Sequence, residues 1–251
     1  MELAEYDKLD SVEDCMWWFA ALHRNLLTAA RRLPLETRKL PMLDAGCGTG
    51  GFLVRLGEEY PDRPLFGLDL NVRACSRAAV KSRQPICAGS ANDLPFVEGS
   101  IAVIFTADLL CHERVDEVRT LRQFHRCLVE HGFLILNLPA YSWLLSRHDA
   151  AVHNVRRYTA SGLRRLLHAA GFHPIFISYW NAILFPLIAF IRKLFPRDPG
   201  AGSDVRPYPY VIDAFCRGVT AFETMLLWRG VILPFGGSVL AVAAKGGGCD
   251  E

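Results

Sequence analysis

A glycine-rich turn between two apolar segments constrains the fold of this chain more than any other feature. The turn reads Asp44-Ala45-Gly46-Cys47-Gly48-Thr49-Gly50-Gly51. It follows an apolar segment at 40–45, which predicts a buried strand, and precedes apolar residues at helical spacing from Phe52 onwards. Glycines at such a junction let the backbone turn sharply and come close to a ligand. The sequence therefore predicts a ligand site where a strand passes into a helix.

Strand and helix signals alternate along the rest of the chain. Short apolar segments that predict strands lie at 64–69, 84–88, 101–106, 133–138, 175–179 and 238–244. Segments with helical periodicity lie between them, at 73–81, 115–128 and 159–171. This alternation is typical of a parallel sheet with helices on both faces. We therefore expect an α/β fold of the three-layer, Rossmann-like kind with a seven-stranded, mostly parallel sheet.

Two segments outside this alternation also have helical patterns. Apolar residues between Asp10 and Leu33 recur at intervals of three and four, as in an amphipathic helix. The residues between the last two predicted strands are rich in Leu, Phe, Ile and Trp. We expect a single domain over 1–251, made of a helical N-terminal cap (1–38), a Rossmann-like core (39–180 and 237–245) and a hydrophobic helical insertion (181–236).

Charge and hydropathy exclude several classes of protein. The chain has 28 Lys and Arg against 26 Asp and Glu, a net charge of +2, which argues against binding nucleic acid by bulk charge. The longest apolar stretch, Tyr179 to Ile191, contains Asn181 and Pro186 and is too short to cross a bilayer. The acidic start of the sequence at residues 1–5 lacks the order of a signal peptide. We therefore expect a cytoplasmic protein.

Cysteine spacing argues against a disulfide framework or a structural zinc site. The eight cysteines are scattered, with no Cys-x-x-Cys pair and no histidine at zinc-like spacing. We expect reduced, mostly buried thiols and predict no metal ion.

The glycine turn is compatible with two kinds of nucleotide cofactor. Gly46-x-Gly48-x-x-Gly51 satisfies the dinucleotide fingerprint, and Asp69 lies where an acid accepts hydrogen bonds from ribose hydroxyls. A nicotinamide-dependent oxidoreductase is therefore one alternative. Asp44, however, precedes the first glycine by two positions, and its carboxylate would repel a pyrophosphate but attract a cationic amino-acid group.

Three segments resemble the class I S-adenosylmethionine-dependent methyltransferases, in particular bacterial methyltransferases of type 11. Residues 43–50 resemble the first motif of that family. Residues 89–96 resemble its Gly-Asp-Ala-x-x-Leu-Pro-Phe segment with Ser90 in place of the acid, which leaves the adenine contact to a hydroxyl, Asn92 or Asp93. Residues 107–112 resemble its Asp-x-Leu-Glu-His segment with Cys111 in place of Glu.

The resemblance implies S-adenosylmethionine as the cofactor and S-adenosylhomocysteine as its product. A divalent metal could take part but is not predicted. The residues that the resemblance places around the cofactor are Asp44, Gly46, Cys47, Gly48, Gly50, Asp69, Leu70, Ser90, Ala91, Asn92 and Ala107.

The segment after the fifth predicted strand supplies the candidate catalytic residues. His148, Asp149 and His153 could form a proton-accepting cluster in which Asp149 orients an imidazole, or could bind a divalent metal, and we favour the base. Tyr141 is a fourth candidate. The alternative is that these side chains are solvated loop residues and that the neighbouring arginines pair with surface acids.

The remaining candidates would contact the methyl acceptor. Arg156, Arg157 and Tyr158 could hold an anionic group by forked hydrogen bonds. Trp17 and Trp18 belong to an aromatic N-terminal element that resembles one in type-11-like enzymes, and His112 and Trp180 complete the predicted acceptor-binding set.

The hydrophobic insertion allows three interpretations. It could roof an apolar acceptor, rest on a membrane to collect a lipid-linked acceptor, or pack as a helical hairpin on the sheet edge. We expect methyl transfer from S-adenosylmethionine to a small, apolar or lipid-like acceptor by in-line displacement, with no nucleic acid as partner and peripheral membrane contact through 181–236 as an option. The alternatives are an NAD(P)-dependent oxidoreductase and a non-catalytic nucleoside-binding module.

Overall fold

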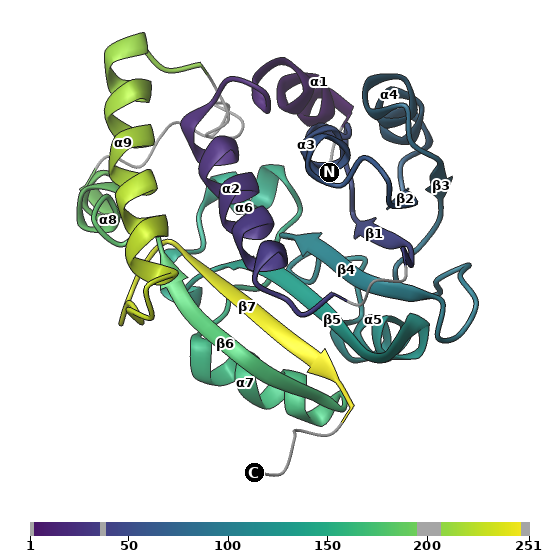
Figure 1. The fold of residues 1–251 in the computed structure, drawn as a ribbon. Helices are drawn as coiled ribbons and strands as arrows, with labels where there is room; N and C mark the ends of the chain where they lie inside the picture. The colour runs from purple at the N-terminus through teal and green to yellow at the C-terminus, as the bar shows by residue number, and fades with distance from the viewer. Residues whose placement is uncertain (1–2, 36–38, 195–206, 247–251) are drawn as a thin grey trace.

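A single seven-stranded sheet organises the computed structural model, which describes residues 3–35, 39–194 and 207–246 (Figure 1). The strand order is β3-β2-β1-β4-β5-β7-β6, and β7 runs antiparallel to both of its neighbours while β1 to β5 pair in parallel. This confirms the expected Rossmann-like, mostly parallel sheet. The strands are β1 (Met42–Ala45), β2 (Leu65–Asp69), β3 (Ile86–Ala88), β4 (Ile101–Ala107), β5 (Leu128–Pro139), β6 (Phe172–Trp180) and β7 (Ser238–Lys245).

Helices cover both faces of the sheet and give three layers. The apolar faces of α5 (Glu117–Cys127) and α7 (Ala160–Ala169) pack against one side. On the other side, α2 (Trp17–Arg31), α3 (Gly51–Glu59) and α4 (Val72–Ser82) bury their apolar residues against the strands. The central strands β1 and β4 are therefore buried on both faces, which is why they read as continuous apolar segments.

The N-terminal cap differs from the single helix predicted over 10–33. It consists of α1 (Leu3–Val12) and α2, and Met16 between them has an extended backbone. The buried Glu13 carboxylate accepts a hydrogen bond from Thr49 Oγ1 at 2.6 Å and pairs with Lys81. Met16 packs with Val12 in a small apolar cluster. These tertiary contacts override the helical periodicity, as burial commonly does.

The insertion forms two helices that pack on the cap. They are α8 (Phe185–Leu194) and α9 (Tyr210–Leu227). A separate short helix, α6 (Arg147–Ala151), lies in the loop after β5. The Thr224 hydroxyl on α9 donates a 2.8 Å hydrogen bond to Asn25 on α2, and the amide of Trp17 donates to Asp213 at 2.7 Å. Cap and insertion therefore contact each other directly beside the sheet (Figure 1).

Candidate functional site

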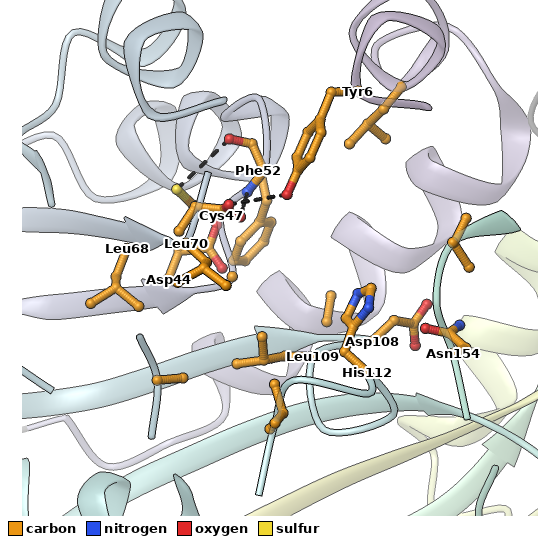
Figure 2. Close-up of a pocket in the computed structure, with 18 of the residues that line it drawn as sticks. Tyr6, Asp44, Cys47, Phe52, Leu68, Leu70, Asp108, Leu109, His112 and Asn154 are labelled. Atoms are coloured by element: carbon orange, nitrogen blue, oxygen red, sulfur yellow. Dashed lines mark hydrogen bonds between the residues drawn. The ribbon is translucent and has the colours of Figure 1, made fainter. Parts of the chain in front are cut away.

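A cavity of about 260 Å³ lies at the carboxyl ends of β1, β2 and β4, with α1 and α2 on its other side. Figure 2 shows Asp44, Cys47, Leu68, Leu70 and Tyr6 gathered at one end, and Asp108, His112 and Asn154 at the other. In open parallel α/β sheets, ligands bind in the crevice outside the carboxyl ends of the strands. The cavity is therefore the candidate active site.

Asp69 is held at the cofactor end of the cavity by three hydrogen bonds. Its carboxylate accepts from the amide of Gly48 at 3.0 Å, from the amide of Asn71 at 2.9 Å and from the Tyr6 hydroxyl at 3.1 Å. Burial and the neighbouring Asp69 raise the pKa of Tyr6, so its hydroxyl keeps its proton and donates. A fixed carboxylate that already binds a hydroxyl suits a ribose diol.

Asp44 is a buried carboxylate without a hydrogen bond or ion pair to any other residue in the described part of the chain. Burial, followed by repulsion from Asp69 and Glu13, raises its pKa to about 8. An unpaired carboxylate beside two further acids makes a negative potential that a cation would relieve. This end of the cavity is therefore built for a positively charged ligand.

Ion pairs with α4 fix the part of the N-terminal cap that covers the cofactor end of the cavity. Lys81 on α4 lies 2.5 Å from Glu13, 3.1 Å from Asp10 and 2.9 Å from Asp14. Glu13 also lines the cavity, so its ion pair with Lys81 closes this end of the cavity and links the end of α1 to α4.

The other end of the cavity carries titratable groups with shifted pKa values. Asp108 follows β4 with a positive φ of 51°, and its carboxylate accepts from Asn137 at 2.9 Å. Burial raises its pKa to about 7, although the Asn137 hydrogen bond opposes the shift. Burial lowers the pKa of His112 to about 4, which leaves that imidazole neutral near pH 7. This end can therefore accept or hold a proton.

One wall of the cavity is aromatic and comes mainly from α2. The Trp18 and Phe19 rings meet edge to face at 5.0 Å, and the His23 and Phe52 rings lie 5.4 Å apart. Burial lowers the pKa of His23 to about 4, so it too is neutral. This wall is therefore suited to bind an apolar molecule or the apolar part of a ligand.

The structure brings twelve of the predicted site residues to this cavity. Those predicted to bind the cofactor are Asp44, Gly46, Cys47, Gly48, Asp69, Leu70, Ser90, Ala91 and Ala107, and those predicted for catalysis or the acceptor are Trp18, His112 and His153. His153 does not join Asp149. Its Nδ1 lies 2.9 Å from the Glu113 carboxylate.

Two predicted cofactor residues have structural roles instead. Gly50 has a φ of 92°, and a Cβ there would lie 2.8 Å from the Cα of Ala78, so it allows α3 and α4 to approach. The Asn92 amide donates to the carbonyl of Arg114 at 2.9 Å and accepts from the amide of Asp116 at 2.9 Å. Both positions lie outside the cavity lining because packing occupies them.

Of the predicted cluster of His148, Asp149 and His153, the two described side chains, Asp149 and His153, have other partners. The buried Asp149 carboxylate accepts two hydrogen bonds from Arg157, each of 2.9 Å, and two more from Ser146. Burial would raise the pKa of Asp149, but the bonds from Arg157 and Ser146 outweigh it and lower the pKa. Among the described side chains Asp149 therefore contacts no imidazole, and the Arg157 guanidinium is engaged by Asp149. The side chain of His148 lies outside the described residues.

The other predicted residues after β5 are likewise structural. Arg156 donates to the carbonyls of His112 and Val115, and the Tyr158 hydroxyl donates to the carbonyl of Leu110 at 2.9 Å. Tyr141 stacks on Tyr179 with ring centroids 5.2 Å apart. None of these three predicted residues lines the cavity.

The two remaining predicted tryptophans belong to the core. Trp180 is 1% exposed and its Nε1 donates to Asn137 at 2.7 Å. Trp17 packs with Val12 and Met16. Neither lines the cavity, because each ring is enclosed by neighbouring apolar side chains.

The cavity also contains residues that the sequence did not single out as site residues. Among them are the polar residues Tyr6, Glu13, Asp108 and Asn154. Asp108 could have been found, because it directly follows an apolar strand whose carboxyl end faces the site. Tyr6 lies 63 residues before its partner Asp69, and no local pattern links them.

Within the residues that the structure describes, no group of three or more His, Cys, Asp or Glu side chains is placed to hold a metal ion. Across the same ranges, 3–35, 39–194 and 207–246, no helix is both long and apolar enough to cross a membrane.

Comparison with known proteins supports a methyltransferase, the class of protein that the fold and the cavity indicate. The sequence model of a family described as a methyltransferase domain matches residues 43–136. A malonyl-[acyl-carrier protein] O-methyltransferase of Dechloromonas aromatica is 29% identical over 165 residues, which cover 62% of this chain. The chain spans 60% of the length of that curated relative.

Solved structures show the same fold at low identity. A chain of the complex between the Haloferax volcanii Trm112 methyltransferase activator and a methyltransferase has a TM-score of 0.62 at 19% identity, covering 99% of this chain and 97% of that chain. Geranyl diphosphate C-methyltransferase of Streptomyces coelicolor has a TM-score of 0.61 at 15% identity, covering 90% and 80%.

These matches confirm the resemblance that the glycine turn first indicated. Residues 43–136 match a methyltransferase domain, and the match and the fold together support a class I methyltransferase that depends on S-adenosylmethionine. The strands and helices that follow complete the seven-stranded sheet of that fold.

Proposed function

We propose that this protein transfers a methyl group from S-adenosylmethionine to a small acceptor with an apolar part. The observation that carries the proposal is the unpaired, buried Asp44 carboxylate beside Asp69 in a cavity that continues to an aromatic wall. A cationic sulfonium nucleoside matches the first end, and an apolar acceptor matches the second.

The cofactor, when bound, supplies an electrophilic methyl group, so the protein needs no nucleophile of its own. Asp69 would accept hydrogen bonds from the ribose hydroxyls in the place where Tyr6 now donates. Asp44 would neutralise positive charge. Ser90 and Ala91 would lie along the base.

Acceptor positioning and water exclusion fall to the N-terminal cap together with the start of α3. Trp18, Phe19 and Phe52 supply the apolar wall against which an acceptor would pack. Holding the acceptor atom behind the methyl group and excluding water are the main sources of acceleration in such a transfer.

Asp108 is the candidate proton acceptor. Its pKa of about 7 places it near the value at which a general base is most effective. His112 and His153 line the same end and would orient the acceptor. The S. coelicolor enzyme acts on geranyl diphosphate, whose geranyl chain is apolar, which supports an acceptor with an apolar part here. The malonyl group on which the D. aromatica relative acts is polar and does not favour this choice.

The test is transfer of label. The protein is incubated with S-adenosylmethionine that is tritiated in the methyl group, together with fractions of small apolar metabolites and lipids. We expect label in the organic phase with at least one fraction, and loss of that label in an Asp69→Asn variant. Cofactor binding without transfer to any fraction would instead identify a non-catalytic nucleoside-binding module.

A nicotinamide-dependent oxidoreductase is the second candidate, favoured only by the spacing of Gly46, Gly48 and Gly51. The buried Asp44 disfavours it, because a pyrophosphate at the turn would raise the pKa of Asp44 further, whereas a cationic ligand would lower it.

A further inference from the structure

Two buried hydrogen bonds connect Asp108 to residues on two other strands of the sheet. The side-chain amide of Asn137 on β5 donates to Asp108 Oδ1 at 2.9 Å, and the indole Nε1 of Trp180 on β6 donates to Asn137 Oδ1 at 2.7 Å. Asn137 is 0% exposed and Trp180 is 1% exposed, so water does not compete for the bond between them. Since β7 lies between β5 and β6, the indole spans one strand to reach Asn137.

The indole of Trp180 determines which way round the Asn137 amide lies. An indole N–H can only donate a hydrogen bond, so the Asn137 oxygen must face Trp180 and the Asn137 nitrogen must face Asp108. The indole is itself held by packing, because its ring centroid lies 6.0 Å from that of Trp18 in the cavity wall. Trp180 therefore ensures that the Asp108 carboxyl group meets a donor.

Asn137 also holds Asp108 through its main chain. The Asp108 amide donates to the Asn137 carbonyl at 2.9 Å, at the point where the Asp108 backbone has its positive φ of 51°. Backbone and side chain of Asp108 are thus both bound to one residue of β5. Asp108 lines the cavity, and its second carboxyl oxygen, Oδ2, makes no hydrogen bond to any residue in 3–35, 39–194 or 207–246. One oxygen is fixed and the other is available to a ligand.

We propose that Asn137 and Trp180 are positioning residues for Asp108, which hold its Oδ1 and leave Oδ2 to take a proton from the methyl acceptor. The acceptor atom would gain the methyl group and lose its proton to Oδ2, while the electron pair of the broken S–C bond stays on the sulfur of the cofactor. Neither Asn137 nor Trp180 lines the cavity, so both act through Asp108. The inference rests on the proposed function for this task, but the hydrogen bonds can be tested without methyl transfer.

The bond from Asn137 affects the pKa of Asp108 more than the charged neighbours do. Burial raises this pKa to about 7, and the Asn137 bond is the largest opposing effect. Arg157 also lowers the pKa and Asp149 raises it, but these two side chains pair with each other. Further titratable side chains at this end, none of which hydrogen-bonds to the Asp108 carboxyl group within the described ranges, are Cys111, His112, Glu113 and His153. Loss of the Asn137 bond should therefore raise the pKa of Asp108.

The experiment follows Asp108 by NMR in protein labelled with carbon-13 at its aspartate carboxyl groups, and the signal that is missing in Asp108→Asn assigns the residue. In Asn137→Leu, which removes the donor, the titration midpoint should rise by about one to two pH units. In Trp180→Phe the midpoint should rise by less, because the amide is then free to turn over. The matched control is Trp228→Phe, since the Trp228 indole N–H has no hydrogen-bond partner among the described residues and its loss should leave the midpoint unchanged.

A measurement on the wild type does not depend on whether these variants fold. The resonances of the Asn137 side-chain amide and of the Trp180 indole N–H should shift with pH at the midpoint of Asp108. The proposal is overturned if these resonances do not respond, or if folded Asn137→Leu and Trp180→Phe, checked by thermal melting, titrate like the control.

Methyl transfer separates this inference from the proposed function. In both variants the pH at which the rate rises should move up together with the NMR midpoint, while calorimetry gives an unchanged affinity for S-adenosylmethionine. Raised midpoints in a protein that transfers methyl to no acceptor would refute the proposed function and the task of Asp108, yet leave the hydrogen bonds in place. A rate profile that stays where it is while the midpoint moves would show that Asp108 is not the proton acceptor.

Discussion

The Tyr6 hydroxyl donates a 3.1 Å hydrogen bond to the Asp69 carboxylate and so joins the first helix to the carboxyl end of β2. The same carboxylate also holds the amide of Gly48 in the glycine turn. Helix α1, the turn and β2 therefore meet at one acid, at the end of the cavity that we assign to the cofactor.

Replacing that acid should remove cofactor binding. An Asp69→Asn variant keeps the size of the side chain but turns one acceptor oxygen into a donor, so it should bind S-adenosylmethionine at least about tenfold more weakly. Calorimetry measures the affinity, and Asp62→Asn, at a side chain that is 76% exposed and outside the cavity lining, serves as the control. Equal affinity in the Asp69 variant and the control would show that the ribose does not bind at Asp69.

Without bound cofactor, ionisation of the Asp44 carboxyl group at high pH should lower the free energy of unfolding. Its pKa is about 8 in the folded state against an ordinary 3.8, so the folded state binds the proton more tightly than the unfolded state between these values. The free energy of unfolding therefore falls as pH rises from about 4 to 8. An Asp44→Asn variant avoids this cost and should be more stable than wild type by about 1–3 kcal/mol at pH 8.

The stability difference should vanish near pH 4, where both states are protonated, and the variant should bind S-adenosylmethionine poorly at every pH. Denaturant unfolding at several pH values and calorimetry make these measurements. A variant that is no more stable than wild type at pH 8 would contradict the assignment of Asp44 as an uncompensated buried acid.

Asp108 should control the pH dependence of methyl transfer. A base with a pKa of about 7 must lose its proton to act, so the rate should rise with pH through about 7 and then level off. In Asp108→Asn the rate should fall about 10²-fold and lose this rise, while cofactor affinity changes little. An unaltered pH profile in the variant would assign the proton to another group.

The Asp149–Arg157 pair should be structural. Both side chains are buried, 1% and 4% exposed, so removing either one leaves an unpaired charge inside the protein. Asp149→Asn should lower the free energy of unfolding by about 3–5 kcal/mol, whereas Lys39→Met, in an exposed pair with Asp62, should cost less than about 1 kcal/mol. Full stability with complete loss of methyl transfer would restore Asp149 as a catalytic candidate.

Sequence reasoning predicted the sheet because buried parallel strands read as apolar segments whose boundaries are set by turns. β1 and β4 are of this kind. β5 begins five residues earlier than predicted, at Leu128, since the Val129–Gly132 stretch has polar residues and gives no apolar signal. The break between α1 and α2 depends on Glu13 and Lys81, which are 68 residues apart, and periodicity cannot register such a contact.

The residues of the candidate site were likewise predicted only where the sequence gives a local signal. The glycine turn and Asp69 were predicted, because each lies directly at the end of an apolar strand. Asp149 and Arg157 were assigned to the site for their chemistry, yet they pair with each other, and the sequence of the loop between them gives no sign of that pairing. Tyr6 reaches the site only through the folded position of α1.

Calorimetric titration of the purified protein with S-adenosylmethionine, and separately with NAD⁺, tests the central claim most directly. Asp44 and Asp69, the two acids at the carboxyl ends of β1 and β2, predict one-to-one binding of S-adenosylmethionine and competition by S-adenosylhomocysteine. They also predict no heat of binding with NAD⁺. Tight binding of NAD⁺ without binding of S-adenosylmethionine would contradict the account.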